Sequence, residues 1–113
     1  MKKNNPRFPL FVDLTDKKIV VVGAGHIAAR RVRTLCQFSG EITVVAPHAC
    51  EEILAWAREG QIRFEERPYR REDIYDAWMV VAATDDAALN REIYTAGKCL
   101  GAWMNVASDR RLC

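Results

Sequence analysis

The chain has 113 residues, of which 50% are apolar and 28% charged, as expected of one globular domain. Its formal net charge of +2 is too small to indicate nucleic-acid binding. No segment approaches the roughly 20 consecutive apolar residues that a membrane span needs. The basic start MKKNNPRF leads into no long apolar core, so we also expect no secretory signal.

In chain order, the first apolar run is PLFVDL at residues 9–14, followed by the turn-like cluster Thr15-Asp16-Lys17. We expect this run to lie across the mouth of a sheet. The next apolar run, IVVV at 19–22, shows no alternation, which is typical of a strand buried on both faces of a parallel sheet.

A G-x-G-x-x-A motif at residues 23–28 follows that strand and opens directly into a helical pattern. Gly23 allows the tight turn, Gly25 lets the backbone approach a pyrophosphate, and Ala28 lets the helix pack closely on the strand. The amides of the first helical turn would face the diphosphate, and the helix dipole favours its charge. Strand, turn and helix in this order predict a dinucleotide site, whereas a tight turn without a ligand is the alternative.

The rest of the chain alternates strands with helices. We expect strands at 41–46, 61–65, 78–83 and 102–106, with Ile62 and Phe64 facing inward on the second of these. Helical spacing predicts buried helix faces carrying Ala28, Val32, Leu35 and Cys36; then Ile53, Leu54 and Ala57; and then Leu89, Ile93, Ala96 and Leu100. The order predicts an α/β, Rossmann-like three-layer fold, with a parallel five-stranded sheet in the order 3-2-1-4-5 and helices on both faces.

The four cysteines are too far apart to form a C-x-x-C pair, so they predict reduced thiols in a cytoplasmic chain. Cys36 and Cys50 are expected to fill space in the core. Structural zinc sites use more closely spaced pairs, so we expect no metal site from this set, Cys36, Cys50, Cys99 and Cys113.

The carboxyl end of the second strand supplies Pro47 and His48 to the predicted crevice. An NAD site usually has an acid about 20 residues after the glycines, to hold the ribose hydroxyls. This chain has none there, because Glu41 sits at the other end of the strand, and no arginine follows that would favour a 2′-phosphate. His48 could bind a ribose or be an ordinary surface histidine.

The fourth strand ends in Thr84-Asp85-Asp86. One of these residues would cap the following helix. A cap needs only one side chain, so the remaining carboxylate and hydroxyl are candidates for a binding or catalytic role. The fifth strand ends in Asn105, followed by Ser108 and Asp109. Asp109 is a candidate general base, with a turn-forming Ser-Asp pair as the alternative.

These segments together resemble the N-terminal domain of the siroheme synthase family, the precorrin-2 dehydrogenase and sirohydrochlorin ferrochelatase proteins. The residues that carry the resemblance are FPLFVDL, VVVGAGHIAARR, VVAP, the loop around 67–69, VVAATDDAALN and MNV. The resemblance implies NAD-dependent oxidation of precorrin-2 to sirohydrochlorin and, in bifunctional members, insertion of Fe2+. It places cofactor contacts at His26, Ile27, Pro47 and His48, and further ones are expected at Thr84 and Asn105.

The chain departs from the family pattern at the catalytic aspartate, because Ser108 stands where several bifunctional members have that aspartate and Asp109 follows it. Asp109, Ser108 and Asp85 are therefore the catalytic candidates. The carboxylate-rich substrate would suit a basic mouth formed by arginines of two loops, Arg67, Arg70, Arg71, Arg110 and Arg111.

Family members continue into a C-terminal dimerisation and tetrapyrrole-binding region. We therefore expect residues 1–113 to be a single dinucleotide-binding domain cut off before that region, homodimeric in the full-length protein, and slow in turnover by itself. A non-catalytic NAD(H)-sensing regulatory domain is the alternative function, since such domains share the sheet and the glycine turn.

Overall fold

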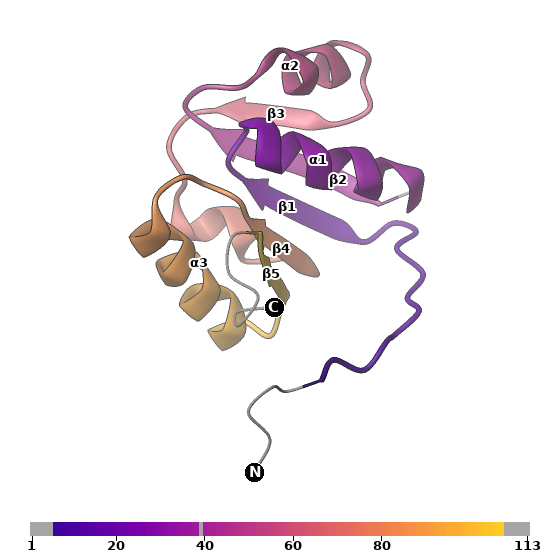
Figure 1. Ribbon diagram of the computed structural model, residues 1–113, viewed down its shortest axis with the longest axis vertical. Coiled ribbons are helices and arrows are strands. Elements are labelled where there is room, and N and C mark those ends of the chain that lie inside the picture. The colour runs from indigo at the N-terminus through magenta and orange to yellow at the C-terminus, as the bar shows by residue number, and fades with distance from the viewer. Residues whose placement is uncertain (1–5, 39, 108–113) are drawn as a thin grey trace.

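The computed structural model describes residues 6–38 and 40–107 (Figure 1). Its centre is a parallel sheet in the order β3-β2-β1-β4-β5, which confirms the predicted topology. The strands are β1 (Lys18–Val22), β2 (Glu41–Ala46), β3 (Arg63–Glu66), β4 (Met79–Ala82) and β5 (Trp103–Val106).

Helices cover both faces of the sheet, as predicted. Helices α1 (His26–Leu35) and α2 (Glu51–Arg58) pack on one face, and α3 (Ala87–Cys99) packs on the other with the 3-10 turn η2 (Arg71–Ile74). A second 3-10 turn, η1 (Cys36–Phe38), extends α1. No helix among the described residues is long and apolar enough to cross a membrane.

The central strand explains why its sequence does not alternate. Ile19 and Val21 join the core under α1 and α2, whereas Val20 and Val22 join the core under α3 and η2. All four side chains are buried. A strand buried on both faces needs apolar residues at every position. The uninterrupted run IVVV therefore reflects the central position of β1 in the sheet.

The predicted start of α3 is confirmed, because the helix begins at Ala87 with Asp86 as its N-cap. Two other expectations were wrong. Leu100 is exposed because α3 ends at Cys99, one residue before it. The segment at 9–14 does not cross the mouth of the sheet: it joins the amino-terminal end of β1, and Figure 1 shows it extending away from the domain. Only Leu14 of that segment is buried, and Phe11 is 100% exposed.

Candidate functional site

The turn between β1 and α1 has the geometry that the glycine motif predicts. Gly23 has φ +110°, and a Cβ there would overlap the carbonyl oxygen of Ala83 and lie 2.7 Å from its carbonyl carbon. A side chain at this position would therefore strain the backbone and also push the turn away from the end of β4. Gly23 also donates its N–H to the carbonyl of Val45 at 2.9 Å, which ties the turn to β2. The turn is thus fixed between the carboxyl ends of β2 and β4, the two strands that flank β1.

Gly25 differs from Gly23, because a Cβ added to it would meet no described atom within 4 Å. It is the N-cap of α1, and no side chain among the described residues caps that helix end. The first-turn amides of α1 are therefore left for an external acceptor. Ile27 is 52% exposed beside them, whereas Ala28 is completely buried against the sheet. This backbone, open at Gly25 and closely packed at Ala28, suits the approach of a diphosphate.

The end of β2 lies next to this turn. Pro47 and His48 are both exposed there, and Glu41 lies at the opposite end of the strand. The start of α2 is connected to the glycine turn directly, because the Cys50 N–H donates to the carbonyl of Ala24 at 2.8 Å. No carboxylate directly follows β2, as the sequence predicted.

The three polar residues after β4 have different roles. Asp86 is the helix cap: its carboxylate accepts the N–H groups of Ala88 at 3.0 Å and Leu89 at 3.1 Å. Thr84 is engaged within the loop, as its hydroxyl donates to the side-chain oxygen of Asn90 at 2.6 Å. Asp85 is exposed and makes no hydrogen bond or ion pair with any described residue. Of the two carboxylates, Asp85 is therefore the one available to a ligand.

Asn90, the last residue of the segment VVAATDDAALN, holds the loop after β4 in place. Its side chain is 3% exposed and closes a ring with Thr84, accepting the Thr84 N–H at 3.1 Å and donating to the Thr84 carbonyl at 3.0 Å. A polar residue is retained on the buried face of α3 because it satisfies both backbone groups of the loop. The resemblance already included Asn90 in that segment, but the sequence did not show which groups its side chain would bind.

The fifth strand reaches the same edge of the sheet. Asn105 is partly buried beside Val81, and the N–H of Ala107 donates to the carbonyl of Ala82 at 3.0 Å. The chain therefore passes close to the end of β4 at Ala107. Ser108 and Asp109 lie outside the described residues, so their roles stay predictions.

The arginines expected to form a basic mouth differ in their surroundings. The Arg67 guanidinium donates to both carboxylate oxygens of Asp73, at 2.6 and 2.9 Å, so it holds η2 against the loop after β3. This bidentate pair holds the pKa of Asp73 below its usual range. The charge of Arg67 is thus already paired, and its place in a substrate mouth stays a prediction. Arg70 and Arg71 are exposed, and Arg110 and Arg111 lie outside the described residues.

Residues 10–113 match a protein-family model described as "Putative NAD(P)-binding". The chain is 42% identical over 106 residues to a siroheme synthase of Pseudoalteromonas atlantica, covering 94% of this chain and 23% of the relative. It is 42% identical over 85 residues to the precorrin-2 dehydrogenase of Bacillus subtilis, covering 75% of this chain and 52% of the relative.

A solved structure titled "SirC, precorrin-2 dehydrogenase" superposes with a TM-score of 0.76 at 32% identity, over 91% of this chain and 50% of that one. The chain therefore spans about half the length of the precorrin-2 dehydrogenases it matches, and about a quarter of the siroheme synthase.

Proposed function

Because the chain belongs to the NAD(P)-binding family that its residues 10–113 match, we propose that it is the dinucleotide-binding part of a precorrin-2 dehydrogenase. The reaction is the NAD-dependent oxidation of precorrin-2 to sirohydrochlorin. The observation that carries the proposal is the contrast between two glycines of one motif. Gly23 is closed against Ala83, and Gly25 is open to a ligand.

The chain's own residues would hold the dinucleotide from two strand ends. The backbone at Gly25 and His26 would bind the diphosphate, with Ile27 as an apolar contact beside it. Pro47 and His48, both exposed after β2, would contact the adenosine ribose in place of the missing acid. Thr84 would act by positioning, since Asn90 already holds its hydroxyl. Asn105 is proposed as a further contact from β5.

The oxidised nicotinamide supplies a hydride acceptor. Precorrin-2 gives up that hydride and one proton, so the protein must also provide a place for the proton. Asp85 is an exposed carboxylate at the carboxyl end of β4, beside the loop that Asn90 fixes. The residues proposed to accept the proton are Asp85, Asp109 and Ser108. Of these three, the structure describes Asp85.

Two properties of the whole protein belong to the same proposal. Insertion of Fe2+ into sirohydrochlorin would use the carboxylate of Asp109, since Ser108 occupies the position of the family's catalytic aspartate. A homodimer in the cytoplasm is the proposed working form. The unpaired thiols of Cys36, Cys50 and Cys99 suit a reducing compartment.

Single-turnover formation of NADH from precorrin-2, with the chain in excess, tests the proposal. Asp85→Asn should slow the step by about 10²-fold or more if Asp85 is the base, while dinucleotide affinity stays unchanged. Asp13→Asn, at an exposed turn far from the crevice, serves as the matched control and should leave the rate unchanged.

Asp109→Ala and Ser108→Ala complete the series. We expect Ser108→Ala to slow the step less than Asp109→Ala does. The opposite ranking would place the serine in the catalytic position. Wild-type rates in all three variants would show that solvent takes the proton, and the carboxylate assignment would then be wrong.

A further inference from the structure

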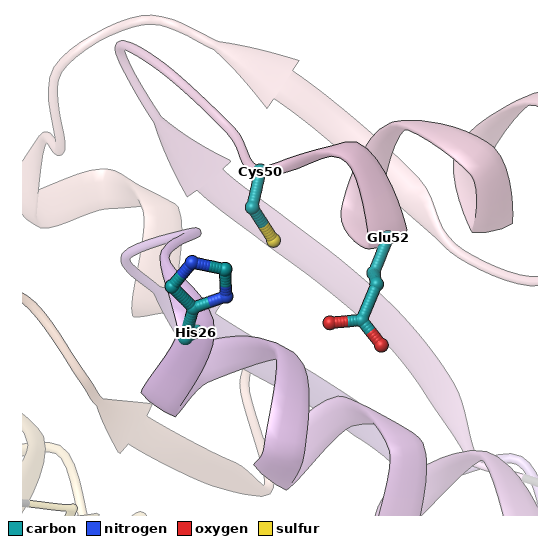
Figure 2. A group of neighbouring side chains, drawn as sticks. All are labelled: His26, Cys50 and Glu52. Atoms are coloured by element: carbon teal, nitrogen blue, oxygen red, sulfur yellow. The ribbon is translucent and has the colours of Figure 1, made fainter.

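We propose that His26, Cys50 and Glu52 form a binding site for a zinc-class divalent ion. Among the described residues, one potential ligand atom from each of these three side chains lies within 4.8 Å of the other two. Figure 2 shows the His26 ring, the Cys50 sulfur and the Glu52 carboxylate around one space between the starts of α1 and α2. This site goes beyond the proposed dinucleotide function, and its test requires no dinucleotide.

The donor set is the one that zinc takes in proteins. Zinc binds cysteine sulfur, histidine nitrogen and carboxylate oxygen, and three protein ligands leave the fourth tetrahedral position to water or another ligand. Bond lengths of about 2.0–2.3 Å place tetrahedral ligands roughly 3.3–3.8 Å apart. Two atoms at the 4.8 Å limit would therefore have to approach by about 1.0–1.5 Å, and closer pairs by less. Rotation of the exposed His26 side chain can supply that movement.

The fold holds the three residues together without an ion. The Cys50 N–H donates to the carbonyl of Ala24 at 2.8 Å, and its thiol donates weakly to the carbonyl of Gly25 at 3.8 Å. His26 follows Gly25 directly, and Glu52 lies in the first turn of α2. The ligands therefore come from two helix starts that the backbone has already joined. An ion bound there would connect α1 to α2 across the glycine turn.

One competing interaction provides a sharp test. The Arg33 guanidinium, in the last turn of α1, binds the carboxylate of Glu52. Both side chains are substantially exposed, and exposed ion pairs of this kind contribute little to stability. A bound ion would compete with Arg33 for the charge of the Glu52 carboxylate, so Arg33→Ala should tighten metal binding by about 1.5- to 5-fold.

The main experiment is a titration of the reduced full chain with Co2+, followed by displacement with Zn2+. We expect one equivalent of Co2+ to give a thiolate-to-cobalt charge-transfer band and tetrahedral d–d bands. Cys50→Ser should abolish the charge-transfer band. Serine is a preferred N-cap, so this variant should keep the start of α2, which circular dichroism checks. His26→Ala and Glu52→Gln should weaken affinity by more than the roughly 10- to 100-fold that loss of an outer-shell partner costs.

Each ligand has a matched control elsewhere in the chain. Glu51→Gln changes the neighbouring carboxylate, His48→Ala changes the second histidine, and Cys99→Ser with Cys113→Ser removes two other thiols. All should retain the band and the affinity. The proposal is overturned if Cys50→Ser keeps the band, if a control loses binding as strongly as its matched ligand variant, or if no tetrahedral spectrum forms.

Discussion

Gly23 and Gly25 are two residues apart, but a glycine is needed for different reasons at the two positions. Gly23 has a positive φ and lies against the backbone of Ala83, so the fold itself needs a glycine there. Gly25 has φ −89° and no described neighbour for a Cβ, so the fold would accept a side chain. The motif letters alone do not separate these roles, because both positions read simply as glycine.

We expect Gly23→Ala to destabilise the fold by about 2–6 kcal/mol, since strained backbone and overpacking each cost roughly 1–3 kcal/mol. Gly25→Ala should cost no more than about 1 kcal/mol, the effect of a poorer N-cap. Urea unfolding followed by tryptophan fluorescence measures both. Equal losses in the two variants would contradict the distinction.

Asn90 offers a second test at the scale of single residues. Removing its side chain would leave the N–H and the carbonyl of Thr84 without their partner, at a cost of about 1–3 kcal/mol. Asn90→Asp is the informative companion, because it keeps an acceptor for the Thr84 N–H but cannot donate to the carbonyl as an ionised carboxylate. Both variants should unfold at lower urea concentration, and wild-type stability in Asn90→Ala would show that the ring is dispensable.

Among the elements, the strands were predicted best. Uninterrupted apolar runs gave β1 and β4, and alternation placed Ile62 inward before β3, because each pattern reports how many faces of a strand are buried. The sheet order followed from the alternation of strands with helices. Met104 of β5 is partly buried, and its side chain fills the space over Gly97 on α3.

The site was less predictable because its contacts join residues far apart in the sequence. The metal-ligand group links α1 to α2, so a survey of cysteine spacing alone could not find it. The pairing of Arg67 could not be predicted either, because its partner Asp73 lies in a polar segment that has the composition of a loop. The periodicity of apolar residues predicts which side chains are buried, but it does not predict which polar groups form hydrogen bonds or ion pairs with one another.

The clamp between Arg67 and Asp73 predicts a specific pH dependence for η2 and the loop after β3. The Asp73 side chain is 7% exposed, and its hydrogen bonds with Arg67 lower the pKa of its carboxyl in the folded state. The unfolded carboxyl titrates near about 3.9. The stabilisation is therefore present above that pH and is lost as the pH falls through the lower folded-state pKa.

Asp73→Asn should accordingly lower stability at pH 7 by about 1–3 kcal/mol, and the difference from wild type should shrink in acid. Urea unfolding at pH 7 and pH 3 provides the comparison. Asp76→Asn is the matched control, since the pKa of Asp76 is also lowered by its partner Lys18 but its side chain is 74% exposed. The control should change stability much less. A difference for Asp73→Asn that is independent of pH would contradict the clamp.

At the scale of the whole molecule, the helices leave part of the sheet uncovered. On the side of α1, the end of the sheet at β4 and β5 presents Trp78 and Trp103, whose ring centroids are 6.1 Å apart. Trp103 is 55% exposed, and β5 is the last strand in the order of the sheet. An exposed aromatic side chain on an edge strand favours association with a second copy.

We therefore expect light scattering to show self-association of the chain that increases with concentration. Trp103→Glu should reduce it, because a charge on the edge strand opposes pairing. Phe38→Glu, which changes an exposed aromatic residue of η1, should have little effect. A monomer at every concentration, or equal effects of the two substitutions, would argue against association through β5.

The dinucleotide site is the central claim, and isothermal titration calorimetry with NAD+ and NADH tests it most directly. The native chain should bind one dinucleotide. Gly25→Val should weaken that binding at least tenfold, about 1.4 kcal/mol, while it remains folded by circular dichroism, because the new side chain blocks the diphosphate without meeting the protein. Absence of binding to the native chain, or unchanged affinity in folded Gly25→Val, would contradict the account.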